Sequence, residues 1–507
     1  MIKKEGWHQT INSPNILGNY VNDKTGNGEQ KGKSMKKKWY KVVATMLLAV
    51  LLVTGCGSAK PEAGKDSEAA VESSSDTSDK ELVRVIVPGL SDVNVVDPIS
   101  GIETKSLHDF EAFLNEQIAD YEIKVLTISW DGWIQKLEAM INAGEADVGF
   151  FTNQEAASQW FADLTPYLEK DEEMNLDNLT DWFIEPAVHY SYYKSFNYPE
   201  ATNKIFGLPM TMACNALVYD SQLFEEWGIA EPTADMTMSE VVDIAEQMTG
   251  TNPVTGKKNY GGQLHTSLME WNAVSYDAVK AYSSNTMDIN ELDQAEYVDY
   301  IKTSEEVRKY MSDMIRMVDA CSEAVATGGG AENFFTADND VAITFHANQH
   351  LLEYMKYVYA GDTEVTSRFK PLLLPTGPEN GMAGFPEFFK FAMTKTASNP
   401  DAAWEVIKTL TTDKEIVDFY LTNYQPDKIT CLKDYDGVTL MEYDINKARY
   451  EYQLKAMFIT DDYWYWRTTL KEVNNQLLSK QYTEEEAIEA FYEGVNSWVE
   501  NIKSQAR

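Results

Sequence analysis

The sequence predicts an α/β protein built as two lobes, and two observations support this. From residue 81 onward, short apolar runs rich in β-branched residues alternate with stretches of helical periodicity. That alternation implies a mainly parallel sheet with helices on both faces. A chain of 507 residues is also too long for one hydrophobic core, so we expect two lobes.

The first elements form a β-α-β-α-β series. Asp131 is of a residue type that caps helix starts, and Gly144 is of the type that ends helices. The expected elements are a strand over 82–87, a helix over 107–118, a strand over 121–128, a helix between Asp131 and Gly144, and a strand over 147–151.

Three later helices carry start signals. Thr237 and Glu240 have the spacing of a capping box, and so do Thr483 and Glu486. Asn399 precedes Pro400, which combines a capping residue with a proline at the first helical position. Each signal is followed by apolar residues at helical spacing, so we expect a helix after each.

The N-terminal region predicts export. A lysine cluster at 35–41 precedes an apolar run at 42–53, and small residues lead to Cys56. The run has about 12 residues, whereas a membrane span needs roughly 20. The stretch 52–56 resembles the bacterial lipobox, so we expect a signal peptide over 35–55 and a lipid on Cys56. Residues 1–34 are interpreted as an extension upstream of the true translation start, and the polar stretch 56–80 as a flexible tether.

Composition excludes some functions. The chain has 80 acidic and 43 basic residues, a formal charge of −37, so nonspecific binding to nucleic acid or anionic lipid is not expected. Beyond Cys56, the cysteines are Cys214, Cys321 and Cys431, whose spacing matches no metal or redox motif. We interpret them as small buried residues and leave a single bridge open. No cofactor or metal is predicted.

Several fragments in one order carry a family resemblance. They are residues 136–148, Phe161-Ala162-Asp163-Leu164-Thr165-Pro166, residues 204–209, Leu217-Val218-Tyr219-Asp220, residues 227–229, residues 340–345 and Ser398-Asn399-Pro400-Asp401. Together they resemble the extracellular solute-binding proteins of family 1, the maltose-binding-like receptors of ABC importers. The resemblance covers roughly residues 81–505.

The resemblance implies a two-lobed periplasmic-binding-protein-like (type II) fold with hinge strands crossing between the lobes. It places 81–215 plus 345–395 in the first lobe and 216–344 plus 396–507 in the second. The run 341–345 fits a strand that leads back into the first lobe. The hinge stretch 210–215 lacks a carboxylate that some sugar binders of the family have.

The implied function is capture of a solute, with delivery to ABC permease subunits in the membrane. The protein is expected to be a monomer, anchored on the outer face of the cell membrane through Cys56. Because the chain is rich in Trp, Tyr and Phe, a carbohydrate, specifically an oligosaccharide, is the expected cargo. The same fold could bind a peptide, a polyamine or another polar solute, and the acidity favours a cation. The sequence names neither the solute nor the permease.

Candidate ligand contacts follow the ends of predicted strands, because ligands bind at the carboxyl ends of open α/β sheets. Aromatic, cationic and hydrogen-bonding side chains at such positions would suit a sugar. The candidates chosen in this way are Asp92, Thr152, Asn153 and, a little further on, Trp160, together with His346 and Asn348 after a crossing strand. Phe385 and Glu387 follow the glycine-containing turn 381–384, and the resemblance implies aromatic contacts at Glu270 and Trp271 in the second lobe. Trp160 could alternatively anchor a helix.

The resemblance implies an aromatic and a cation against the ligand in the run 463–467, which adds Trp464, Trp466 and Arg467 to these candidates. Successive aromatic residues cannot all face one side of a helix, so some must line a pocket or lie exposed. The alternative is that this run packs the C-terminal helix against the second lobe.

Two other protein classes are alternatives to a solute-binding receptor. A surface glycoside-acting enzyme would need a carboxylate pair, which counting cannot exclude, but the chain has no G-x-S-x-G, H-E-x-x-H or phosphate loop. A structural lipoprotein would have no ligand cleft. Asp434-x-Asp436-Gly437 has too few ligand positions for a calcium loop and is interpreted as a turn.

Overall fold

The structure is a computed structural model of the whole chain. It describes residues 80–98, 100–130, 132–152, 157–193, 198–213, 216–233, 235–264, 273, 276, 278, 298–327, 329–330, 333–344, 356–357, 360–373, 387–425, 428–433, 435 and 463–505. The predicted signal peptide, Cys56 and most of the predicted tether lie outside the described residues.

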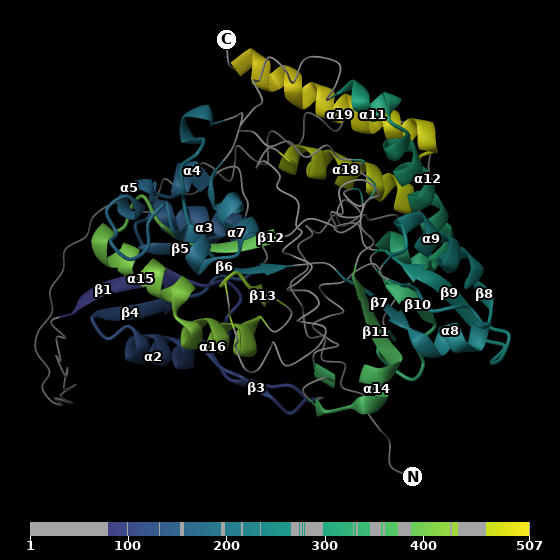
Figure 1. Cartoon of the computed structure of the whole chain (residues 1–507), viewed down its shortest axis with the longest axis horizontal. Coiled ribbons are helices and arrows are strands. Elements are labelled where there is room, and N and C mark those ends of the chain that lie inside the picture. The colour runs from purple at the N-terminus through teal and green to yellow at the C-terminus, as the bar shows by residue number, and fades with distance from the viewer. Residues whose placement is uncertain are drawn as a thin grey trace, which may run out of the picture. The chain divides into compact units, whose positions relative to one another are not determined.

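A six-stranded sheet with the order β13-β6-β12-β5-β1-β4 organises the first lobe (Figure 1). Its strands are β1 (Glu81–Ile86), β4 (Tyr121–Leu126), β5 (Val148–Phe151), β6 (Leu208–Ala213), β12 (Glu387–Met393) and β13 (Ile429–Thr430). Strand β1 runs parallel to β4 and β5, whereas β12 runs antiparallel to both β5 and β6. Strand β6 therefore runs parallel to β5, and the alternation seen in the sequence is confirmed as an α/β sheet.

The first two helices begin and end close to where the sequence predicted. Helix α2 (Leu107–Gln117) starts with a capping box between Ser106 and Asp109. Helix α3 (Trp133–Asn142) ends before Gly144, whose φ is +68°. The expected cap of α3 was wrong, because Gly132 occupies the N-cap position with φ +61°, a conformation that glycine adopts without strain. Asp131 lies outside the described residues.

The other helices of the first lobe are α4 (Ala157–Trp160), α5 (Thr165–Leu168), α6 (Leu179–Trp182), α7 (Glu185–Ser191), η1 (Pro199–Ala201), α15 (Pro400–Thr412) and α16 (Lys414–Tyr424). Asn399 caps α15 through the backbone N–H of Ala402, as predicted. Helix α15 packs on β1, β6 and β12. In the sequence, β1 is followed by β2 (Val95–Val96) and β3 (Glu103–Thr104), which form a small antiparallel sheet ahead of α2.

A five-stranded sheet with the order β11-β7-β10-β9-β8 organises the second lobe. Its strands are β7 (Ala216–Asp220), β8 (Gly250–Thr251), β9 (Lys258–Gln263), β10 (Val341–Thr344) and β11 (Phe369–Leu373). Strands β9 and β10 are parallel, and β7 runs antiparallel to both β10 and β11.

The helices of the second lobe are α8 (Ser221–Trp227), α9 (Met238–Gln247), α11 (Asp299–Thr303), α12 (Glu305–Ala320), η2 (Glu323–Thr327), α14 (Thr363–Arg368), α18 (Tyr463–Leu478) and α19 (Glu484–Gln505). The capping boxes of α9, at Thr237 and Glu240, and of α19, at Thr483 and Glu486, are confirmed. Helices α18 and α19 pack on each other and on α12.

The sheets divide the chain differently from the predicted lobe boundaries. The block 345–395 was expected in the first lobe, but β11 pairs with β7 over five residues of the second sheet. The block 396–507 was expected in the second lobe, but α15, α16 and β13 lie with the first sheet. Strand β10, from which the chain was expected to lead back to the first lobe, lies between β7 and β9, within the block 216–344 predicted for the second lobe. Strand pairing, which local sequence does not encode, decides these memberships.

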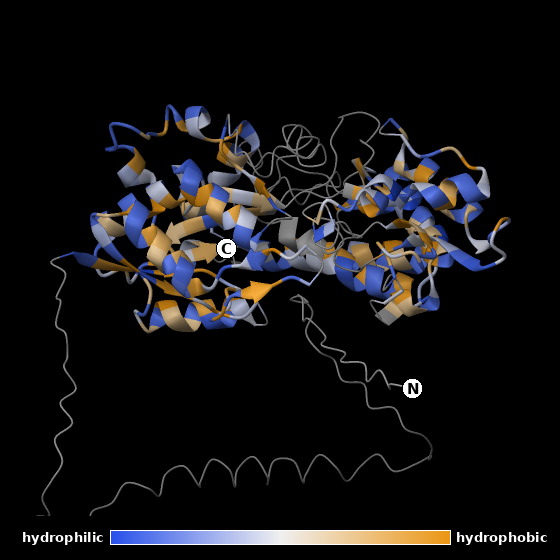
Figure 2. Cartoon of the chain, turned by 90° about the horizontal axis from the view of Figure 1, so that it is seen from below, coloured by the Kyte–Doolittle hydropathy of each residue, from blue (hydrophilic) through white to orange (hydrophobic). Residues whose placement is uncertain are grey.

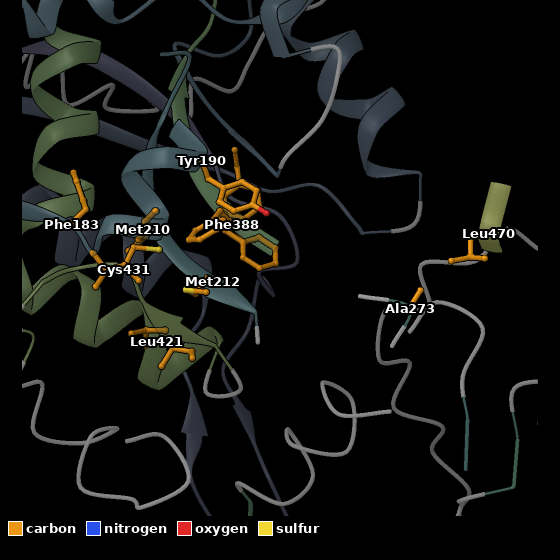
Figure 3. Packing of buried hydrophobic residues seen from close by; sticks show 14 of the residues in the cluster. Phe183, Tyr190, Met210, Met212, Ala273, Phe388, Leu421, Cys431 and Leu470 are labelled. Carbon is orange, nitrogen blue, oxygen red and sulfur yellow. The ribbon is translucent and has the colours of Figure 1, made fainter. Parts of the chain in front are cut away.

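Apolar side chains of the strands are covered by the helices. Figure 2 shows hydrophobic residues concentrated on the strands and hydrophilic ones on the outer helix surfaces. Figure 3 shows Met210 and Cys431 beside Phe183, and Phe388 against Tyr190, whose ring centroids lie 4.6 Å apart. Cys321 and Cys431 are buried, as predicted, and Cys214 lies outside the described residues. No helix of the described part is long and apolar enough to cross a membrane.

Two ion pairs fasten α15 and its N-terminal turn to the first lobe. Asp147, just before β5, accepts hydrogen bonds from the Arg84 guanidinium and from the backbone N–H of Ser398. Asp171 lies 2.8 Å from the Lys408 amine and also accepts a hydrogen bond from the Trp404 indole. Burial alone would raise the pKa of Asp171, but these bonds and two backbone N–H groups lower it to about 2.

We predict that Asp171→Asn lowers the free energy of unfolding by about 2 kcal/mol at pH 7, because an ionised Asp171 is favoured in the folded state. A depressed pKa stabilises the fold above the unfolded value of 3.8, and that contribution is lost as the pH falls toward 2. Urea unfolding from pH 7 to pH 2 should show the two proteins converging. Glu172→Gln, on the neighbouring exposed residue, is the control. A constant difference at every pH would contradict the assignment.

Candidate functional site

The carboxyl ends of the parallel strands in the first sheet share one edge. Strands β1, β4, β5 and β6 all end there, and β12 begins there, since Glu387 pairs with Ala213 and Lys390 with Phe151. Chain leaves this edge after β6 and returns to it before β12.

The second sheet has a matching edge. Leu373 at the end of β11 pairs with Ala216 at the start of β7, and Thr344 at the end of β10 pairs with Val218. Gln263 at the end of β9 pairs with Thr344. The two crossings, from β6 to β7 and from β11 to β12, therefore join the carboxyl edges of the two sheets. Ligands of open α/β sheets bind at such edges, so these edges define the candidate site.

Trp130 is the most prominent side chain at the first edge. Beyond the end of β4, the pairing with β1 continues through a bond from the Gly89 N–H to the Ile128 carbonyl. The half-buried Trp130 ring lies directly on Gly89, since a Cβ on Gly89 would be 2.2 Å from the indole Nε1. Its ring meets Trp133 and Phe150 edge-on, at centroid distances of 5.9 and 6.0 Å. A fixed, partly exposed indole of this kind suits stacking against an apolar ligand face.

The sequence-based candidates did not include Trp130, although a signal was present. Asp92 and Thr152 were chosen because they follow the first and third strands, and Trp130 follows the second strand in the same way. The same rule applied to every strand would have found it.

A second aromatic side chain, Phe389, lies on β12, and Lys428 lies just before β13. Phe389 is 6% exposed and stacks on Phe150 with a centroid distance of 5.6 Å. The Lys428 amine lies 5.5 Å from the centroid of Phe389. Trp130, Phe150, Phe389 and Lys428 therefore form a row across the sheet near its carboxyl edge, with one half-buried indole and one cation.

Four predicted contacts lie on described elements of the first lobe. Thr152 follows β5 and is 3% exposed, and Glu387 opens β12 at the same edge. Asp92 is exposed between β1 and β2. The backbone carbonyl of Trp160 accepts a hydrogen bond from Lys395, which lies beyond the opposite end of β12. The structure thus brings Thr152 and Glu387 to one edge and places the Trp160 backbone at the other.

The remaining candidates lie on or near the second lobe, or outside the described part. Trp464, Trp466 and Arg467 are in the first turns of α18, which packs on α12 and α19. Leu470 of α18 and Ala273 are both buried members of the same hydrophobic cluster. The candidates Asn153, Glu270, Trp271, His346, Asn348, Phe385 and Cys56 lie outside the described residues.

Metal-binding clusters are not found among the described residues. Asp434 and Asp436 of the weak calcium-loop match lie outside that part of the chain. The described edge residues offer aromatic rings, a cation and hydrogen-bonding groups, an arrangement suited to holding a polar solute.

The chain belongs to the bacterial extracellular solute-binding protein family, whose model matches residues 105–416. The family expected from the sequence is therefore confirmed. A search of curated protein sequences gave no match.

Solved structures share the fold at low sequence identity. An ABC substrate-binding protein from Listeria monocytogenes in complex with cycloalternan is 15% identical with a TM-score of 0.60, covering 83% of this chain and 99% of that one. The GacH receptor of Streptomyces glaucescens, solved with acarbose, is 13% identical with a TM-score of 0.60 over 83% and 99% of the two chains. Maltose-bound MalE3 of T. maritima is 15% identical with a TM-score of 0.55 over 82% and 99%. The two-lobed type II fold predicted from the sequence is confirmed.

We predict that Gly89→Ala displaces the Trp130 ring. Gly89 has φ +81°, and the added Cβ would overlap the indole. Strain at such a position costs about 1–3 kcal/mol before any displacement is counted. Gly101→Ala is a matched control, because Gly101 has φ +70° but no atom within 4 Å of the added Cβ. Near-ultraviolet circular dichroism should change only in Gly89→Ala, and identical spectra for the two variants would refute the contact.

Proposed function

We propose that the protein is the carbohydrate-binding receptor of an ABC importer, with an oligosaccharide as its cargo. The observation that carries the proposal is the half-buried Trp130, which is fixed on Gly89 at the carboxyl edge of the first sheet. Two chain crossings join this edge to the carboxyl edge of the second sheet. A sugar ring has apolar faces surrounded by hydroxyl groups, so an indole surface close to polar groups suits it. The structural neighbours include proteins solved with cycloalternan, acarbose, maltose and mannotriose.

The rival cargo of the same fold is a peptide or a polyamine. The formal charge of −37 favours a cation over the whole surface. At the described edge, however, the Lys428 amine lies 5.5 Å from the centroid of Phe389. A cationic side chain at this position disfavours a polyamine locally, so we rank a neutral or weakly anionic carbohydrate first.

The two crossings suggest how binding is signalled. A ligand that contacts both carboxyl edges stabilises the form in which the edges are close, and the equilibrium shifts only as far as its affinities for the two forms differ. Membrane permease subunits would then recognise the closed form. No bond of the ligand needs to break in this cycle, so the protein acts as a receptor and not as an enzyme.

A thermal-shift panel tests the cargo. Mono- and oligosaccharides, short peptides and polyamines are added separately to the purified protein. A ligand at 100 times its Kd stabilises the folded form by about 2.7 kcal/mol, which is a clear rise in Tm. We expect an oligosaccharide to give that rise and to remain chemically unchanged. A rise with spermidine or a peptide alone would support the rival cargo, and release of smaller sugars would identify an enzyme.

Truncation of Trp130 tests the site with the sugar found in that panel. We expect Trp130→Ala to weaken binding about tenfold, the effect of losing one aromatic contact. Trp227→Ala is the control, because Trp227 is also half-buried but bonds to Asn259 within the second lobe. Calorimetry on Trp271→Ala and Trp464→Ala tests those two proposed contacts in the same way. Equal affinities in Trp130→Ala and Trp227→Ala would remove Trp130 from the site.

The membrane anchor is proposed from the lysine cluster, short apolar run and small residues that precede Cys56. Cells fed an alkyne fatty acid should label the parent protein and the Cys321→Ala control. Cys56→Ala should remain unlabelled and appear in the medium or periplasm. Equal labelling of Cys56→Ala and the parent would contradict lipidation at this position.

A further inference from the structure

A lysine lies at one lateral end of the first sheet, where β13 begins. Strand β13 lies beside β6 (Figure 1) and runs antiparallel to it, with Ile429 paired to Met212. Lys428, the residue before Ile429, is therefore beside the carboxyl end of β6, at the edge that carries the candidate site. Trp130 follows β4, the strand at the other end of the same sheet. Trp130 and Lys428 thus belong to opposite ends of one edge.

The backbone of Lys428 is held on both sides. Its N–H donates to the carbonyl of Gln425, and the residue that follows it is paired with β6. Gln425 is 7% exposed and forms the C-cap of α16, and its Oε1 accepts a hydrogen bond from the Thr211 hydroxyl of β6 at 3.2 Å. The point from which the Lys428 side chain starts is therefore set by the core of the first lobe.

The Lys428 side chain extends toward the aromatic residues of the edge. Its amine lies 5.5 Å from the ring centroid of Phe389 on β12, so the side chain crosses β6, which lies between β13 and β12. Phe389 stacks on Phe150, and Phe150 meets the Trp130 ring edge-on. Because Lys428 is half-buried, its cation interacts with other charges more strongly than the cation of a fully exposed lysine would.

These contacts give the row of residues a chemical direction. Trp130 offers an indole for the apolar face of a sugar ring, and Lys428 offers a cation at the other end. Neighbouring strands are about 4.8 Å apart, so a row that crosses several strands is longer than one sugar ring. A neutral donor would serve sugar hydroxyl groups, whereas a cation distinguishes a negatively charged group from a neutral one.

The acidity of the whole chain makes such a cation necessary for an acidic cargo. With a formal charge of −37, the protein repels anionic solutes at long range. That repulsion is screened over about 8 Å at physiological ionic strength, so a cation in direct contact with the ligand outweighs it locally. We propose that Lys428 is a specificity-determining residue that selects an oligosaccharide bearing a carboxylate or sulfate group, with another ring of the sugar on Trp130. This assignment rests on the proposed function for the sugar and adds the negative charge.

Matched trisaccharides test the charge. Maltotriose, cellotriose and mannotriose are each compared with their C6-carboxylate form, with the methyl ester of that form and with a 6-sulfated form. The ester has nearly the shape of the acid without its charge, and the sulfate separates the two kinds of acidic group. In calorimetry at physiological ionic strength, we expect a carboxylate or sulfate form to bind about tenfold more tightly than its uncharged counterpart.

Lys428→Met keeps most of the side-chain length and removes the charge. We expect the affinity for the acidic sugar to fall about tenfold, with the affinity for its uncharged counterpart and the Tm unchanged. Lys428→Arg should keep the preference. Lys433→Met is the matched control, because Lys433 carries the same charge but is exposed beyond the other end of β13, where its amine donates to the Thr180 carbonyl. A preference that survives in Lys428→Met, or that is lost equally in Lys433→Met, overturns the assignment.

Three outcomes separate the acidic cargo from the carbohydrate function. If neutral trisaccharides bind as tightly as the acidic ones, the carbohydrate receptor stands and the acidic cargo is wrong. If triglutamate binds in place of every sugar and its binding is lost in Lys428→Met, the carbohydrate is wrong and the selection of negative charge by Lys428 stands. If the parent binds neither acidic sugars nor triglutamate, the selection by Lys428 is overturned, whatever else the parent binds.

Discussion

The antiparallel insertion of β12 between β5 and β6 is the constraint on which the rest of the structure depends. Because β12 pairs with both neighbours, its first residue lies where β5 and β6 end. Chain that arrives from the second sheet must therefore enter the first sheet at the carboxyl edge of its parallel strands. In the second sheet β7 and β11 are antiparallel, so the start of β7 lies beside the end of β11. Both crossings are therefore confined to the edges at which α/β sheets bind ligands.

Buried polar contacts hold this arrangement in register. Asp147, just before β5, accepts hydrogen bonds from Arg84 on β1 and from Ser398 in the turn before α15. These bonds hold the three segments together in addition to the apolar core. In the second lobe, Asp220 at the end of β7 accepts two bonds from Arg368 and one from Asn339. Each carboxylate joins elements that are distant in sequence. Breaking one would leave a buried charge, so these contacts specify the pairing in addition to contributing stability.

The described part of the candidate site at the first edge is preorganised. Trp130 is held by Gly89, Trp133 and Phe150, all on elements anchored in the first sheet. A preorganised aromatic surface loses little conformational freedom on binding, which favours affinity.

The sequence by itself determined the local features of this protein. The helix starts at Thr237, Asn399 and Thr483 depend on hydrogen bonds within four residues, so their patterns could be recognised directly. The order of short apolar runs likewise indicated the α/β class, and the ordered fragments indicated the family by their resemblance to it. Only the tertiary structure decided that β11 belongs to the second sheet, that α15 covers the first, and that Trp130 rests on Gly89. Those outcomes depend on strand pairing and packing between residues far apart in the chain, where many partners are compatible with the same local sequence.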